Sequence, residues 1–150
     1  MGAADEIRTR IEGAWRAFRA AIDTVDLEAP TRAGWTAKEM LAHVAFWMET
    51  VPPYVTGAFR GDPSAFSITF PSGYVAGEGD WPHADVHNAR EAAWARDRAA
   101  AEVMGRAERA HDELRAFLTT VTDDEVAANA AYFAEVADHL EEHRTIELST

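Results

Sequence analysis

The chain contains no cysteine, and this absence excludes several kinds of site at once. Without thiols there is no disulfide framework, no thiolate metal site and no cysteine nucleophile. A transition-metal site in this chain would have to be built from histidine or carboxylate ligands.

Positive charge and long apolar runs are also scarce. The chain has 14 Lys and Arg against 26 Asp and Glu, a formal net charge of -12. Binding to phosphates needs clustered Lys and Arg, so we expect no nucleic-acid partner and no anionic membrane partner.

No run reaches the length of about 18 apolar residues that spans a bilayer. Residues 1–12 carry charge where a signal peptide would be apolar, which predicts a cytoplasmic protein.

The hydrophobic pattern is that of a helical protein. With 150 residues and 47% hydrophobic content, we expect one domain with a proper core. Apolar residues recur at three- and four-residue steps and predict helices over about 5–25, 36–59, 85–119 and 122–147. Thr36 with Glu39 and Thr122 with Glu125 have the spacing of capping boxes. Residues 60–84 are rich in glycine and proline and predict an irregular crossover whose aromatic residues pack on the body. The fold class is therefore all-α, a four-helix bundle.

Three histidines lie on the apolar faces of these helices. His139 and His143 are four residues apart and share one face of the fourth helix. His43 lies on the inner stripe of the second helix, between Met40 and Trp47. Three imidazoles make a ligand set that binds Zn²⁺ and leaves positions open for water or substrate. Hydrogen-bonded core histidines are the alternative.

The positions of these histidines constrain the topology. His43 comes early in the second helix, whereas His139 and His143 come late in the fourth. They meet only if these helices run antiparallel, which predicts an up-down-down-up order with a long crossover between helices two and three. Helices of this length span about 30 Å, a distance that the crossover covers easily at about 3.3 Å per residue.

The remaining histidines allow several interpretations. His83 and His87 open the third helix, with Asp85 and Asn88 nearby, and are candidates for supporting, substrate-binding or acid–base roles. Helix capping and surface polarity are the alternative, and the two also form a rival pair of metal ligands at i, i+4 spacing. His111 lies farther along an inner stripe, and we interpret it as structural.

Two stretches carry a resemblance to a known family. Trp35-Thr36-x-Lys38-Glu39-x-Leu41-x-His43-x-x-x-Trp47, followed by His139-x-x-x-His143, resembles the DinB/YfiT-like superfamily of four-helix proteins. This group includes the metal-binding domain of mycothiol-dependent maleylpyruvate isomerases. The resemblance implies a divalent metal, zinc or nickel, held by His43, His139 and His143, and it implies a homodimer. Relatives include thiol-dependent S-transferases or isomerases and resistance proteins, but nothing in the chain points to a particular low-molecular-weight thiol.

These observations lead to a mechanistic hypothesis. The metal would activate a thiol cosubstrate or water toward a small electrophilic substrate. His87 or Glu142 would carry protons, and Trp47, His83 and Tyr132 would line the substrate pocket. Two alternatives stay open: a metal that only staples a small-molecule-binding or resistance protein, and histidines that bind no metal.

Overall fold

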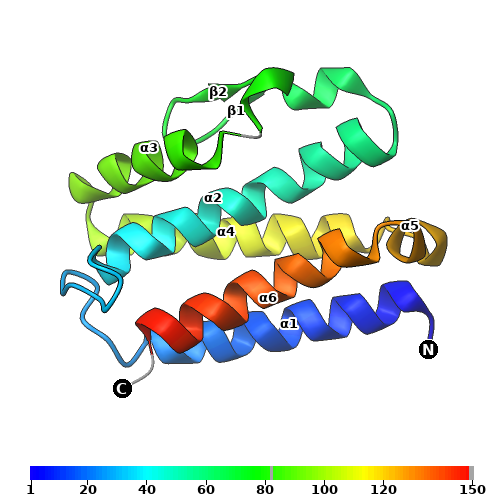
Figure 1. Cartoon of the computed structure of the whole chain (residues 1–150). Helices are drawn as coiled ribbons and strands as arrows, with labels where there is room; N and C mark the ends of the chain where they lie inside the picture. Colours follow the sequence, from blue (N-terminus) through cyan, green and yellow to red (C-terminus); the bar gives the residue numbers. More distant parts are fainter. Residues whose placement is uncertain (82, 149–150) are drawn as a thin grey trace. The chain divides into compact units, whose positions relative to one another are not determined.

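A computed structural model of the chain describes residues 1–81 and 83–148 (Figure 1). It confirms the all-α fold class, because helices account for most of the described residues and the strands are two residues long each. The chain forms two compact units, one of Met1–Ala37 with Arg115–Thr150 and one of Lys38–Leu114. None of the helices within the described residues is long and apolar enough to cross a membrane.

The first unit is built on two long helices, α1 (Ala3–Ile22) and α6 (Ala130–Glu147), together with the short α5 (Asp123–Ala128), which directly precedes α6 in the chain. Ile7, Ile11 and Phe18 form the buried stripe of α1, as the periodicity predicts. Figure 1 shows that α1 and α6 run in the same direction, and Arg10 of α1 forms an ion pair with Asp138 of α6. At the start of α1, the Ala4 amide donates to the Asp123 carboxylate at 2.8 Å.

The second unit contains α2 (Ala37–Tyr54), α3 (Ala84–Arg96) and most of α4 (Ala100–Leu118). Pro52 and Pro53 do not end α2, which passes directly into a π-helical turn at Val55–Phe59. α2 and α4 run in the same direction (Figure 1), so the chain must return along the unit between them. This agrees with the order predicted for helices two and three.

The return path is longer and more structured than the predicted crossover. It includes 3₁₀ turns at Pro63–Phe66 and Glu78–Asp80, a two-stranded antiparallel hairpin of β1 (Ile68–Thr69) and β2 (Val75–Ala76), and the whole of α3. Residue 82, within the predicted crossover, lies outside the described residues. The aromatic residues of this path do pack on the body, since Phe66, Phe70 and Trp81 are buried in a cluster with Phe46 of α2.

Two of the predicted helices are each divided in two. The helix expected over 85–119 breaks at residues 97–99, where Lys38 Nζ donates to the carbonyl oxygens of Arg98 at 2.8 Å and Arg96 at 3.4 Å. The helix expected over 122–147 breaks at Asn129, whose side-chain amide donates to the Glu125 carbonyl oxygen at 3.0 Å. Each break exposes carbonyl oxygens that a nearby side chain then satisfies. α1 ends at Ile22, earlier than the predicted residue 25.

Candidate functional site

His139 and His143 form a pair on α6, as their spacing predicts. Their Nε2 atoms lie 3.0 Å apart, and the ring planes are nearly perpendicular, with centroids 4.5 Å apart. Two ring nitrogens at this distance repel each other if both present lone pairs. One of them must carry a proton, or both must face a shared cation.

Burial keeps His139 neutral. Desolvation, with a smaller contribution from His143, lowers the pKa of His139 from 6.5 to about 3. At neutral pH its imidazole is therefore uncharged, which is the form that ligates a metal ion.

His143 is held from its other side by Glu147, one helical turn further along α6. The Nδ1 atom of His143 lies 2.9 Å from Glu147 Oε2, and the Glu147 side chain is only 3% exposed. The indole Nε1 of Trp35 donates to the other carboxylate oxygen, Oε1, at 3.3 Å. Trp35 also packs against the His143 ring, with centroids 5.9 Å apart. These contacts fix both the position and the plane of the His143 imidazole.

His43 belongs to the second unit and has a similar support. It is 6% exposed, and its Nδ1 atom lies 2.9 Å from Oδ1 of Asn88 on α3. Trp47, one turn after His43 on α2, donates its indole N–H to the same oxygen at 2.8 Å. The predicted pocket residue Trp47 thus contacts the support of His43, and α3 brings Asn88 to α2 from 45 residues away.

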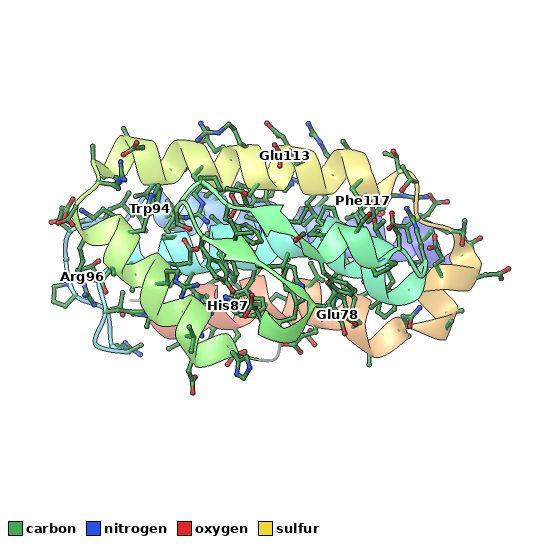
Figure 2. All side chains as sticks on the ribbon, turned by 90° about the horizontal axis from the view of Figure 1, so that it is seen from above. Glu78, His87, Trp94, Arg96, Glu113 and Phe117 are labelled. Carbon is green, nitrogen blue, oxygen red and sulfur yellow. The ribbon has the colours of Figure 1, made fainter. Side chains whose placement is uncertain are left out.

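His87, a predicted proton carrier, lies on α3 (Figure 2). It is a core residue with 1% exposure. Its ring packs against Phe46 and Tyr74, with centroids 5.1 and 5.0 Å away. Nε2 lies 2.6 Å from the Asp80 carbonyl oxygen, and because a carbonyl only accepts, Nε2 is the donor. Nδ1 is buried, with no hydrogen-bond partner among the described residues. The proton-carrying role of His87 stays a prediction.

The other predicted site residues are spread over the two units. Glu142 is exposed on α6, and Tyr132 is half-buried at the start of α6, with its ring edge-on to Phe133. His83 is exposed at the N-cap position of α3, beside a hollow that it forms with Ala84–Val86. His111 is buried, 5% exposed, as expected of a structural residue.

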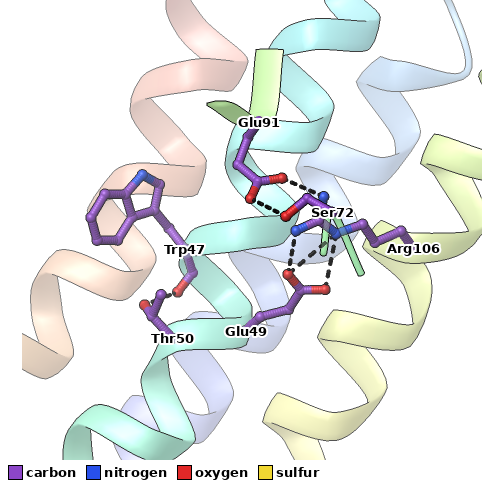
Figure 3. A network of polar contacts seen from close by, with 6 residues as sticks. All are labelled: Trp47, Glu49, Thr50, Ser72, Glu91 and Arg106. Atoms are coloured by element: carbon purple, nitrogen blue, oxygen red, sulfur yellow. Dashed lines mark hydrogen bonds and ion pairs between the residues drawn. The ribbon is translucent and has the colours of Figure 1, made fainter. Parts of the chain in front are cut away.

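A polar cluster that the sequence did not reveal lies inside the second unit (Figure 3). Arg106 of α4 is 1% exposed and donates to Glu49 of α2 at 2.6 Å and to Glu91 of α3 at 2.5 Å. Ser72 donates to the other oxygen of Glu91 at 2.9 Å. Burial raises the pKa of Glu49, although Arg106 opposes the shift. Glu49 and Arg106 also line a cavity of about 250 Å³ together with Arg109 and Glu113.

Three residues with important contacts, Glu147, Asn88 and Arg106, were not predicted from the sequence, each for a different reason. Glu147 is four residues after His143, so the i, i+4 rule that paired the histidines also predicts this contact. The sequence places Asn88 only near His83 and His87, because its contact with His43 depends on tertiary structure. No local pattern identifies Arg106 as a buried residue, since arginine is ordinarily exposed.

Comparison with known proteins gives one match. The model of the DinB superfamily matches residues 10–145 of the chain, a span that includes residues of both compact units. Neither the curated proteins nor the solved structures gave a match.

Proposed function

The chain belongs to the DinB superfamily, and from this membership we propose that it is a divalent-metal-dependent enzyme. The proposed ligands are His43, His139 and His143, which can offer one ring nitrogen each to a metal ion. Imidazole suits both zinc and nickel, and the chain has no cysteine that would compete as a ligand.

The His139–His143 pair is the observation that carries this proposal. Two imidazole nitrogens bound to one metal at about 2.0–2.1 Å, with an angle of about 90–110° between them, lie about 2.8–3.4 Å apart. The observed Nε2 separation of 3.0 Å falls within this range. The neutral state of His139 and the Nδ1 hydrogen bond of His143 are the further features of a metal-binding histidine pair.

The reaction that we propose is transfer or isomerisation at a small electrophilic substrate. A divalent ion with three imidazole ligands supplies a Lewis acid with open positions, which makes a thiol or water nucleophilic at neutral pH. The chain's own contribution is to hold the imidazole of His139 neutral and those of His43 and His143 oriented. In this proposal Trp47, His83 and Tyr132 contact the substrate, and His87 or Glu142 carries protons. A low-molecular-weight thiol is the proposed cosubstrate.

Metal analysis of single-histidine variants tests the ligand set. We expect the purified wild-type protein to hold one equivalent of zinc or nickel, and His43→Ala, His139→Ala and His143→Ala each to lose stoichiometric binding. His111→Gln is the matched control, because it removes a buried histidine outside the proposed set, and it should keep the metal. Full occupancy in His43→Ala would overturn the proposal.

A second experiment separates catalysis from a purely structural metal. Metal-loaded protein is screened with electrophiles and with bacillithiol, mycothiol and glutathione, with chelator-treated protein as the blank. Metal-dependent consumption of thiol supports the enzyme. If chelation lowers the melting temperature but no thiol and no hydrolytic substrate turns over, the metal is a staple in a binding or resistance protein.

We also propose that the chain forms a homodimer, as the family resemblance implies. Analytical ultracentrifugation of the metal-loaded and metal-free proteins tests this directly. A sedimentation coefficient that stays at the value for a 16.5 kDa monomer at high micromolar concentration would contradict it.

A further inference from the structure

Two of the three proposed ligands share a supporting arrangement that repeats in the two units. In each, an indole N–H and a histidine Nδ1 converge on one polar side chain. Trp47 and His43 meet at Asn88 Oδ1, and Trp35 and His143 meet at the carboxylate of Glu147. We propose that Asn88 and Glu147, each held by its tryptophan, are positioning residues that fix the tautomers of His43 and His143. This inference rests on the proposed metal-binding function.

The indole of Trp47 decides the orientation of Asn88. An indole N–H is only a donor, so the Asn88 atom that it contacts at 2.8 Å must be the carbonyl oxygen and not the amide nitrogen. The same oxygen lies 2.9 Å from His43 Nδ1. Because that oxygen only accepts, Nδ1 of His43 carries the proton. The lone pair of the neutral ring is then on Nε2, the atom that would face a metal.

The same reasoning applies to His143. An ionised carboxylate only accepts hydrogen bonds, so His143 Nδ1, 2.9 Å from Glu147 Oε2, is the donor. Trp35 occupies the second carboxylate oxygen at 3.3 Å and restrains the rotation of the group. The lone pair of His143 is therefore on Nε2, the atom that lies 3.0 Å from Nε2 of His139. Both supports leave the same ring nitrogen available for coordination.

The two supports differ in charge, which gives them separable effects. Glu147 is an acidic partner of His143, whereas Asn88 is a neutral partner that orients His43 without adding charge. Partners of this kind in other metal sites change metal affinity by about 10- to 100-fold when they are removed. We expect Asn88→Leu and Glu147→Leu each to weaken zinc binding within that range of about 10- to 100-fold.

Conservative variants distinguish positioning from packing. Asn88→Asp keeps an acceptor oxygen and should bind zinc more tightly than Asn88→Leu, although Leu and Asn have similar sizes. Trp47→Phe and Trp35→Phe keep an aromatic ring but remove the N–H, and each should weaken zinc binding. Trp94→Phe is the control, because Trp94 contacts Arg106 and belongs to neither support. Its affinity for zinc should equal that of the wild type.

The decisive measurement is the tautomer of each histidine in the metal-free protein. Long-range ¹H–¹⁵N correlation spectra of the full chain, labelled at histidine, distinguish a protonated Nδ1 from a protonated Nε2. We expect Nδ1–H for His43 and His143 in the wild type, with His43 losing this preference in Asn88→Leu and keeping it in Asn88→Asp. Thermal unfolding of each variant verifies that it is folded.

The outcomes separate this inference from the proposed function. Nε2–H at His43 in the wild type, or unchanged tautomer and zinc affinity in Asn88→Leu, would overturn the positioning role. Both histidines in the Nδ1–H form, in a wild-type protein that binds no metal, would overturn the metal site and leave the tautomer assignment in place.

Discussion

Arg106 is a charged residue in the interior, and its partners determine what its loss would cost. Its guanidinium is 1% exposed and contacts two carboxylates, those of Glu49 and Glu91. Arg106→Met keeps the volume but leaves both acids without their cation in a buried environment. Removing one member of a buried ion pair costs about 3–5 kcal/mol, so we expect a loss of that size in the free energy of unfolding. Urea denaturation at pH 7 measures it.

Glu49→Gln is the matched change at the acidic partner of the Arg106–Glu49 ion pair. Because burial raises the pKa of Glu49, its ionised form is disfavoured in the fold. The contribution of Glu49 to the free energy of unfolding is therefore fully present below its unfolded-state pKa and is lost as pH rises through its folded-state pKa. A neutral amide still accepts from Arg106, so Glu49→Gln should cost much less at pH 7 than Arg106→Met. Equal losses would show that the charge of Glu49 is as important as that of Arg106.

Some contacts in the candidate site join residues that are close in sequence, and others join residues that are far apart. The pairing of His139 with His143 follows from helical geometry, and the structure confirms it. The contact of Glu147 with His143 obeys the same rule. Asn88 reaches His43 from 45 residues away, and no pattern in one sequence specifies such a contact. The sequence therefore predicts the histidine pair on α6, whereas the support of His43 becomes visible only in the folded structure.

At the scale of elements, the π-helical turn at Val55–Phe59 depends on a glycine. A Cβ atom on Gly57 would lie 2.6 Å from the nearest ring atoms of Phe66, which belongs to the aromatic cluster. Gly57→Ala must displace that ring, and overpacking of this kind costs about 1–3 kcal/mol. Gly13→Ala is the control: Gly13 is exposed within α1 with nothing within 4 Å of a new Cβ. It should stabilise the protein by about 0.5–1 kcal/mol. Opposite shifts in melting temperature are expected, and a stabilising Gly57→Ala would contradict the prediction.

The start of α5 has a capping box that the sequence predicts and the structure confirms. The Thr122 hydroxyl accepts from the Glu125 amide at 3.1 Å, and the Thr122 amide donates to Glu125 Oε1 at 3.1 Å. Thr122→Ala removes one acceptor and should cost about 1 kcal/mol in urea denaturation. Thr122→Ser keeps the hydroxyl and should cost little. Equal stability of the Ala and Ser variants would show that the cap contributes nothing.

Helix breaks were harder to predict than helix starts. Thr122 marks a start through its own side chain, and the signal lies within four residues. The break at residues 97–99 is accompanied by hydrogen bonds from Lys38, which is about 60 residues away, and the segment itself contains neither glycine nor proline. Asn129 does satisfy a carbonyl within its own turn, but asparagine inside a helical pattern is too common to be a reliable signal.

At the scale of the whole chain, the directions of the helices can be predicted from the sequence, whereas the path of the chain between α2 and α4 cannot. The placement of three histidines predicts that helices two and three run in the same direction, and α2 and α4 do so in their unit (Figure 1). The prediction for the crossover specified only that it is long enough to return along the helices. The structure uses that segment to place aromatic residues on α2, and the helix that follows it, α3, presents Asn88 to His43. The return path between α2 and α4, which includes α3, therefore supplies the support of His43.

The stability of the metal-free protein should depend on pH through His139. Its pKa falls to about 3 in the fold, from 6.5, so between these values the unfolded chain binds a proton that the folded chain does not. Unfolding is then favoured as pH falls. The stability that neutral His139 contributes to the fold is fully present above about pH 6.5 and is lost progressively toward pH 3. For one such group, linkage gives a loss of about 2 kcal/mol between pH 7 and pH 5.

Urea denaturation of the chelator-treated full chain at pH 7, 6 and 5 measures this dependence. His139→Gln is the comparison, because glutamine does not titrate and the other five histidines of the chain are unchanged. The free energy of unfolding of this variant should fall less steeply with acid, by about 2 kcal/mol over the range. Parallel pH profiles for the two proteins would show that His139 accepts a proton in the fold as readily as in the unfolded chain. In the metal-loaded wild type, the bound ion adds a stabilisation that acid removes as the ligands protonate, so its profile should be steeper still.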